Sequence, residues 1–171
     1  MSPSSSANLA ILKEAFAHLN ARNIPGCLNL MRPDFIINIA EMPYQKTGHS
    51  AWKRHTEILF SAIPDVKVHM EDAIAADDKV AVRMRIRGTH RGEFLGQRGT
   101  GKAIDYLSHE IYRFENGKIA EEWICSDSVT LMTQIGALSQ GRLALMWFSG
   151  YRFWFGMASG IAVFALIQRA L

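Results

Sequence analysis

Apolar and polar residues alternate with a period of two near the middle of the chain, as on a strand with one buried face. The predicted inner face carries Val80, Val82, Met84 and Ile86, and the outer face carries Ala81, Arg83, Arg85 and Arg87. Residues 66–75, 103–114 and 118–127 are further strand candidates. Asn116-Gly117 joins the last two and predicts a tight hairpin, because this pair readily adopts positive φ.

The N-terminal third carries apolar residues at helical spacing instead. Residues 8–23 and 49–65 predict two helices, the second capped by Ser50, and a short helix between them ends before Pro33. Residues 35–40 form a β-rich run. Helices followed by antiparallel strands predict an α+β domain, in which a curved antiparallel sheet forms a cone and the N-terminal helices pack on it. The mouth of such a cone is a natural binding pocket.

Composition and charge narrow the class of protein. The 171 residues are 49% apolar and 20% charged, and a net charge of +3 without a Lys/Arg block predicts no nucleic-acid partner. Two cysteines, Cys27 and Cys125, form no disulfide framework and suit a reducing, intracellular location. We expect a disordered N-terminus over residues 1–8, a cone domain over 9–138 and a hydrophobic helical extension over 139–171.

The C-terminal extension is nearly uncharged, and Arg152 is the one charged residue between 143 and 167. Trp147, Tyr151 and Trp154 gather near one end of this run, as in an interfacial aromatic belt. The run is short for a span unless Arg152 lies in the interface. Two interpretations therefore stay open: membrane contact through residues 143–167, or an extra helix that covers the cone or a partner subunit.

Several motifs occur in the order seen in one known family. They are residues 63–96, which end in RGTHRGEFLG, then TGKAIDY, RFENGKIAEEW and LMTQIGAL. On these motifs, residues 9–138 resemble the SnoaL-like polyketide cyclases, whose cone fold is shared with nuclear transport factor two and ketosteroid isomerase. The resemblance implies a homodimeric enzyme that cyclises or isomerises polyketide-like carbon skeletons and uses no cofactor. Residues 97–102 depart from the family, which often has a proline before TGK.

Asp127 is the first candidate catalytic residue. The resemblance implies that it matches the family's catalytic aspartate, four residues after Trp123. Aldol ring closure needs a base that removes a proton next to a carbonyl and an acid that protonates the new alkoxide. One carboxylate in an apolar cavity can do both in turn, because burial raises its pKa. The structural alternative is that Asp127 caps the helix that follows it.

Two histidines, His109 and His90, are further catalytic candidates, because either could donate a hydrogen bond to an enolate oxygen or hold Asp127. The hairpin register decides which side chains share the face of Asp127. A two-residue loop would place there Tyr106, Ser108 and Glu110. A three-residue loop with a glycine bulge would place there Asp105, Leu107 and His109. The sequence leaves both registers open.

Aromatic side chains could line an apolar pocket for a ring-forming substrate. The substrate-binding candidates are Trp123, Trp52, Phe16, Phe35, Phe94 and Tyr106, with Asn38 as a polar contact. Histidine spacing predicts no metal site. The arginines at positions 83, 85 and 87 form a basic stripe that is solvated, faces a dimer partner or binds an anionic group.

We therefore expect a cofactor-independent cyclase or isomerase of a small hydrophobic, polyketide-like or meroterpenoid intermediate in secondary metabolism, with Asp127 as general base and then acid. An alternative from another class is a non-catalytic module of the same fold that binds a lipophilic ligand or dimerises. A third is a related enzyme that opens a lactone or epoxide with water positioned by Asp127. An Asp127 buried in a ligand-sized cavity would favour the enzyme, and an Asp127 that caps a helix would favour the module.

Overall fold

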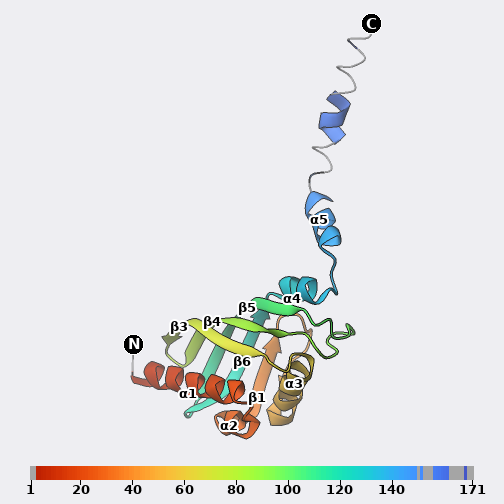
Figure 1. The fold of residues 1–171 in the computed structure, drawn as a ribbon. Helices are drawn as coiled ribbons and strands as arrows, with labels where there is room; N and C mark the ends of the chain where they lie inside the picture. The colour runs from red at the N-terminus through yellow and green to blue at the C-terminus, as the bar shows by residue number, and fades with distance from the viewer. Residues whose placement is uncertain (1–2, 150, 152–155, 162–167, 169–171) are drawn as a thin grey trace. The chain divides into compact units, whose positions relative to one another are not determined.

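The computed structural model describes residues 3–149, 151, 156–161 and 168, which fall into two compact units, Met1–Gly136 and Ala137–Leu171. The first unit packs helices against a six-stranded curved sheet, which confirms the predicted α+β class (Figure 1). Its helices are α1 (Pro3–Asn20), α2 (Ile24–Asn29), α3 (Gly48–Ala62) and α4 (Ser128–Ile135). Its strands are β1 (Met31–Ile39), β2 (Lys46–Thr47), β3 (Lys67–Ala76), β4 (Lys79–Thr89), β5 (Ala103–Glu115) and β6 (Lys118–Ser126).

The strand order in the sheet is β2-β1-β6-β5-β4-β3, so the first long strand lies beside the last one. The strands from β3 to β6 form an antiparallel meander, as the predicted run of antiparallel strands and the Asn116-Gly117 turn indicate. The pairing of β1 with β6 is parallel, which the sequence did not indicate. A parallel neighbour needs a long crossover, and here the whole of α3 and the meander lie between the two strands.

The core lies between the inner face of the sheet and the N-terminal helices. The inner residues of β4 are all buried, as the period of two predicts: Val80, Val82, Met84 and Ile86. Leu12 from α1 and Trp52 from α3 pack against this face, and Phe35 from β1 is fully buried. Figure 1 shows α1 running across one face of the sheet, with α3 close to β1.

Three boundaries differ from those predicted. Helix α1 begins at Pro3 rather than at residue 8, and Ser5 is buried in its first turns. Helix α3 begins at Gly48 after Thr47, so Ser50 lies inside the helix and is not its cap. Helix α2 ends at Asn29, before Pro33 as predicted, but β1 begins at Met31 rather than at residue 35, so Pro33 lies within the strand. Ser5 is buried, whereas Ser50 and Pro33 are exposed, so packing against the core accounts for the first difference alone.

The second unit contains α5 (Gln140–Ser149), in which no residue is buried. In the part of this unit that the structure describes, no helix is both long enough and apolar enough to cross a membrane. Much of the predicted apolar run, including Arg152, Trp154 and residues 162–167, lies outside the described residues.

Candidate active site

An interior cavity of about 100 Å³ lies between the inner face of the sheet and helices α1 and α3. Most of its wall is apolar, with Phe16 from α1 and Trp52 from α3 among the lining residues. Three ionisable side chains that could exchange protons near neutral pH also line it, namely Glu110, Glu122 and His55. An apolar hollow with a few convergent polar groups is the usual form of a small-molecule site.

Glu110 is buried on the inner face of β5 and accepts two side-chain hydrogen bonds. The Ser108 hydroxyl donates to its Oε1 at 2.8 Å, and the Tyr112 hydroxyl donates to its Oε2. Ser108 also contacts the hydroxyl of Ser126 on β6 at 3.0 Å. Burial raises the pKa of Glu110 above its usual range, while the two hydrogen bonds oppose that rise.

Glu122 is buried on β6, directly opposite Tyr112 in the strand register and diagonal to Glu110. Burial, with the nearby charge of Glu110, raises the pKa of Glu122 well above its usual range. Two carboxyl groups whose charged forms are disfavoured, and which repel each other when both ionise, share protons unequally. The arrangement therefore favours protonation of at least one of the two carboxyl groups over the state in which both are ionised.

His55 reaches the same cavity from α3. Burial lowers the pKa of this imidazole, and the positive charge of Lys46 lowers it further. The ring is therefore neutral near pH 7 and can either accept or donate a hydrogen bond. The site thus combines two carboxyl groups on the sheet with a neutral imidazole on a helix.

A β-bulge in β6 decides which carboxylates face this cavity. Glu115 pairs with Lys118 across a two-residue loop, and Phe114 pairs with Ile119, but Arg113 pairs with Glu121, which leaves Ala120 as the extra residue. One extra residue exchanges the two faces of the strand beyond it. Inward-facing residues on the far side of the bulge are Glu122, Ile124 and Ser126, and outward-facing ones are Trp123 and Cys125. The hairpin therefore has the predicted two-residue loop. Beyond the bulge, however, Asp127 has the strand parity of Asp105, Leu107 and His109, as predicted for the three-residue loop.

Asp127 therefore lies away from the cavity. Its backbone N–H donates to the carbonyl of Leu107, and its exposed side chain caps α4. Oδ1 accepts from the Thr130 N–H at 3.0 Å, and Oδ2 accepts from the Thr130 hydroxyl at 2.6 Å. These hydrogen bonds lower the pKa of Asp127. The predicted environment, a carboxylate in an apolar cavity, is met by Glu110 and Glu122 instead.

Three predicted residues lie together on the outer face of the sheet. Asn38, His109 and Trp123 line a second hollow, of about 690 Å³. The Asn38 amide is held by the Glu121 carboxylate at 3.1 Å and the Glu122 carbonyl at 3.0 Å. His109 is exposed and pairs across the strands with Cys125 and Arg83. His109 and Trp123 alternate along their strands with Glu110 and Glu122, so their side chains point to the opposite face of the sheet, although Glu110 also forms part of the wall of this hollow.

The remaining predicted residues occupy the core or the loop of residues 90–102. His90 is fully buried there, with Nδ1 3.1 Å from the Thr100 hydroxyl, while Nε2 has no hydrogen-bond partner among the described residues. Phe94 pairs through its backbone with Gln97 in the same loop. Phe35 belongs to the core, and Tyr106 is buried on the inner face of β5, where burial raises its pKa. Neither His90 nor Phe94 lines the interior cavity.

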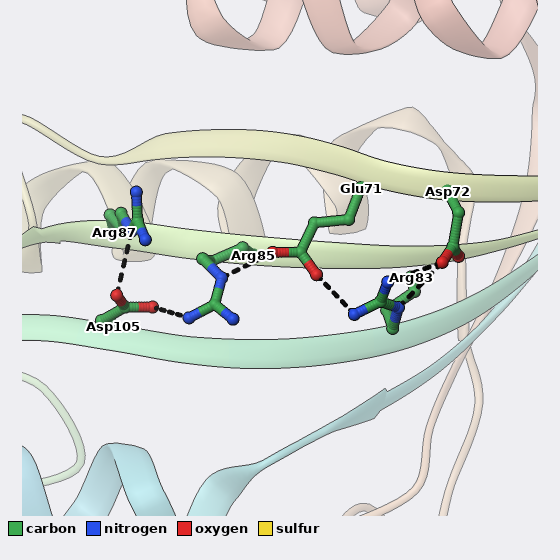
Figure 2. Close-up of polar contacts among 6 residues, drawn as sticks. All are labelled: Glu71, Asp72, Arg83, Arg85, Arg87 and Asp105. Atoms are coloured by element: carbon green, nitrogen blue, oxygen red, sulfur yellow. Dashed lines mark hydrogen bonds and ion pairs between the residues drawn. The ribbon is translucent and has the colours of Figure 1, made fainter.

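The basic stripe on the outer face is paired with acids of the same chain, as Figure 2 shows. Arg83 bridges Glu71 at 2.6 Å and Asp72 at 2.7 Å. Arg85 bridges Glu71 at 2.6 Å and Asp105 at 2.9 Å. Arg87 completes the ladder with Asp105 at 2.9 Å. Three arginines and three acids give a neutral surface, which weakens the interpretation of the stripe as an anion site.

No three His, Cys, Asp or Glu side chains in the described part of the chain are arranged to hold a metal ion. Glu110, Glu122 and His55 are not among the predicted catalytic or substrate-binding residues, although one of the two predicted registers places Glu110 on the face of Asp127. A signal existed for Glu110, because it has the strand parity of Tyr106, Tyr112 and Phe114 and must share their buried face. No comparable signal existed for Glu122, whose direction depends on the bulge.

Comparisons with known proteins agree with this architecture. The model of the SnoaL-like polyketide cyclase family matches residues 10–135. The chain is similar to AclR, a putative hydroxylase from Streptomyces galilaeus, with 26% identity and a TM-score of 0.71 over 78% of this chain and 98% of that one. It is similar to wild-type IdmH, a putative polyketide cyclase from Streptomyces antibioticus, with 26% identity and a TM-score of 0.67 over 75% and 98% of the two chains.

The chain is also similar to a putative SnoaL-like polyketide cyclase from Jannaschia sp. CCS1, with 22% identity and a TM-score of 0.75 over 81% of this chain and 97% of that one. At this level of identity the similarity supports only the fold. A comparison with curated proteins gave no match.

Proposed function

Because the chain belongs to the SnoaL-like polyketide cyclase family, we propose that its interior cavity cyclises or isomerises a polyketide-like or meroterpenoid substrate through an enolate, with Glu110 and Glu122 as the acid–base pair. The observation that supports this proposal is the pair of buried carboxyl groups on one wall of an apolar cavity. Burial raises the pKa of both groups. Such a rise brings carboxyl groups towards the range in which they exchange protons at neutral pH.

The two glutamates differ in a way that assigns their roles. Glu110 accepts hydrogen bonds from Ser108 and Tyr112, which stabilise its carboxylate form. Glu110 is therefore the base that removes a proton from the carbon next to a substrate carbonyl. The resulting enolate carbon attacks a second carbonyl, and the neutral Glu122 donates its proton to the new alkoxide. Tyr112 lies opposite Glu122 and contacts Glu110, so it can return the proton from Glu110 to Glu122.

The size of the cavity limits what enters it. An engineered cavity of about 150 Å³ in another protein binds benzene, and the cavity here is about 100 Å³. We therefore place only the reacting dicarbonyl end of the substrate beside the glutamates. Phe16 and Trp52 line the apolar wall against which that end would pack. His55, on α3, can hydrogen-bond a carbonyl oxygen of the substrate. The acidity of a dicarbonyl supplies part of the activation, so this proposal includes no cofactor.

Product profiling of three isosteric variants tests the proposal. A host that accumulates a candidate polyketide intermediate would express the native chain, Glu110→Gln, Glu122→Gln or Asp127→Asn, and products would be identified by mass spectrometry and NMR. Each glutamine variant should lose about 10²- to 10⁴-fold in product formation, the usual contribution of general acid–base catalysis. Asp127→Asn, the matched control, should keep the native product.

Two outcomes would contradict this assignment. If both glutamine variants fold and still form the native product at the native rate, the carboxyl pair is not catalytic, and the non-catalytic binding module becomes the better interpretation. If only Asp127→Asn abolishes the product, the chemistry depends on the carboxylate predicted from the sequence and not on the cavity.

A second proposal concerns self-association, which the family resemblance implies. The outer hollow exposes Ile74 and Ile111 beside Trp123, and contiguous apolar surface of this kind commonly marks a protein interface. We propose that this face forms the homodimer. Ile111→Glu should lower the mass measured by sedimentation velocity to that of a monomer, whereas Ile58→Glu on the exposed face of α3 should leave it unchanged. A native chain that is monomeric at micromolar concentration would refute the proposal.

A further inference from the structure

Helix α5 carries a run of large apolar side chains that are not covered by the rest of its unit. Leu145, Met146, Trp147 and Phe148 are 74%, 67%, 71% and 59% exposed, and Tyr151 just beyond the helix is 56% exposed. No residue of the helix is buried. Isolated exposed apolar residues are ordinary, but a contiguous group of this size marks an interaction surface.

The distribution around the helix axis indicates what kind of partner fits. At about 100° per residue, the four apolar residues from Leu145 to Phe148 spread over most of the circumference. Arg142 and Ser149, seven positions apart, lie within about 20° of each other on the remaining narrow face. A groove on a partner protein takes one stripe of a helix, about 100° wide. An apolar arc much wider than that is better matched by the boundary between lipid headgroups and acyl chains, which can surround it.

The charge of this segment is complementary to one class of surface. No Asp or Glu occurs after Asp127, and the only charged side chains beyond it are Arg142, Arg152 and Arg169. These three arginines equal the whole net charge of +3, so residues 1–127 are neutral in sum. A cationic segment without acids, rich in Trp, Phe and Tyr, is attracted to anionic lipid headgroups and retained by its aromatic side chains.

We propose that α5, with Tyr151 just beyond it, binds the surface of anionic lipid bilayers as an interfacial helix. The helix does not need to cross the bilayer, which agrees with the lack of a membrane-spanning helix among the described residues. Binding combines burial of the α5 apolar arc in the headgroup–acyl boundary with attraction of Arg142, and of the net positive charge of the segment, to anionic headgroups. If the proposed function holds, the interfacial helix would also bring the catalytic unit to apolar substrates dissolved in the membrane.

Co-sedimentation of the full chain with vesicles tests the proposal. One set of vesicles would contain phosphatidylcholine alone, and the other phosphatidylcholine mixed with phosphatidylglycerol. The full chain should bind the anionic vesicles more strongly than the neutral ones and should be largely released at about 1 M salt, where the Debye length is about 3 Å. Trp147→Ser with Phe148→Ser should lower the partition coefficient at least about tenfold, and Arg142→Gln should lower it about fivefold.

Matched changes on α3 serve as the control, because Ile58 and Arg54 are also exposed on a helix. Ile58→Ser with Arg54→Gln should leave vesicle binding unchanged. Equal binding to neutral and anionic vesicles, or binding that survives high salt and alkaline extraction, would overturn the interfacial assignment. Failure to bind any vesicle, with the α5 variants instead losing a protein complex or an oligomer, would show that the partner is a protein. Since binding is measured without substrate, these outcomes are independent of whether the carboxyl pair is catalytic.

Discussion

Substitutions of Asp127 can distinguish a helix cap, whose loss lowers the stability of the fold, from a catalytic residue, whose loss lowers turnover. Asp127→Ala removes both acceptors that Thr130 uses, one for its N–H at 3.0 Å and one for its hydroxyl at 2.6 Å. Loss of an N-cap costs about 0.5–2 kcal/mol. Here the Asp127 side chain is exposed, so water can satisfy the freed N–H, and we expect a cost near the middle, about 1 kcal/mol.

The structure indicates that this loss lowers the free energy of unfolding of the whole first unit and does not merely fray the first turn of α4. Leu131 and Ile135 of α4 are buried against the core, so the helix cannot detach without exposing them. A loss of about 1 kcal/mol should lower the melting temperature by about 2–6 °C for a unit of this size. Asp127→Ser and Asp127→Asn keep an acceptor at the cap and should stay within about 0.5 kcal/mol of the native chain.

The assay pairs thermal or urea unfolding with product formation per folded molecule for each variant. All three variants should retain native turnover. A serine variant with native stability and turnover reduced about 100-fold would refute the reasoning, because the cap would be intact and only the carboxylate missing. An alanine variant of native stability would show that the Thr130 contacts contribute nothing.

The cap also predicts a dependence on pH. Thr130 holds the pKa of Asp127 below its unfolded value of about 3.9. The stability from this carboxylate is therefore present above about pH 4 and is lost as the pH falls through the lower, native pKa. Asp127→Ser should lack this part of the acid-induced loss, as urea midpoints between about pH 2 and 6 would show.

Three further predictions concern the first unit. Burial raises the pKa of Glu110 in the native state. The free energy of unfolding should therefore fall as the pH rises from the unfolded pKa of about 4.3 towards the native pKa. Glu110→Gln should flatten that fall in urea midpoints measured from about pH 4 to 9. Gly99→Ala would put a Cβ 2.0 Å from the Arg91 carbonyl oxygen, so it should lower the free energy of unfolding measured in urea by about 1–3 kcal/mol. An unchanged urea midpoint would mean that the loop of residues 90–102 shifts freely. Gly136, with φ +86°, ends α4 in the left-handed region, so Gly136→Ala should cost about 1 kcal/mol and Gly136→Asn less, by the same measurement.

Much of the sheet follows from local rules. The alternation in β4 identifies its buried face, and Asn116-Gly117 gives the two-residue hairpin. The parallel neighbour of β1 does not follow, because nothing local in either strand records which distant strand it will meet. The salt-bridge ladder has the same origin, since Arg85 meets Glu71 and Asp105 only through pairings across strands.

The candidate site was predictable in part. The cone, its apolar cavity and the lining by Phe16 and Trp52 were expected from the sequence. The catalytic carboxylate predicted from the sequence, Asp127, lies at a helix cap, a role that its position before α4 also allowed. Glu122 was not predictable, because a period-two count from the hairpin fails at the bulge.

The bulge at Ala120 also affects how roles can be transferred among relatives. Ala120, between Ile119 and Glu121, has no partner of its own on β5. The position of a β6 residue counted from the Asn-Gly turn therefore differs by one from its position counted from α4. An alignment that places no gap at Ala120 would match Glu122 with an outward-facing residue of a protein without the bulge, because the two strands then have the same length but opposite faces. Equivalent positions in this part of the fold are therefore those that share a cross-strand partner, such as Tyr112 for Glu122, rather than those that share a distance along the chain.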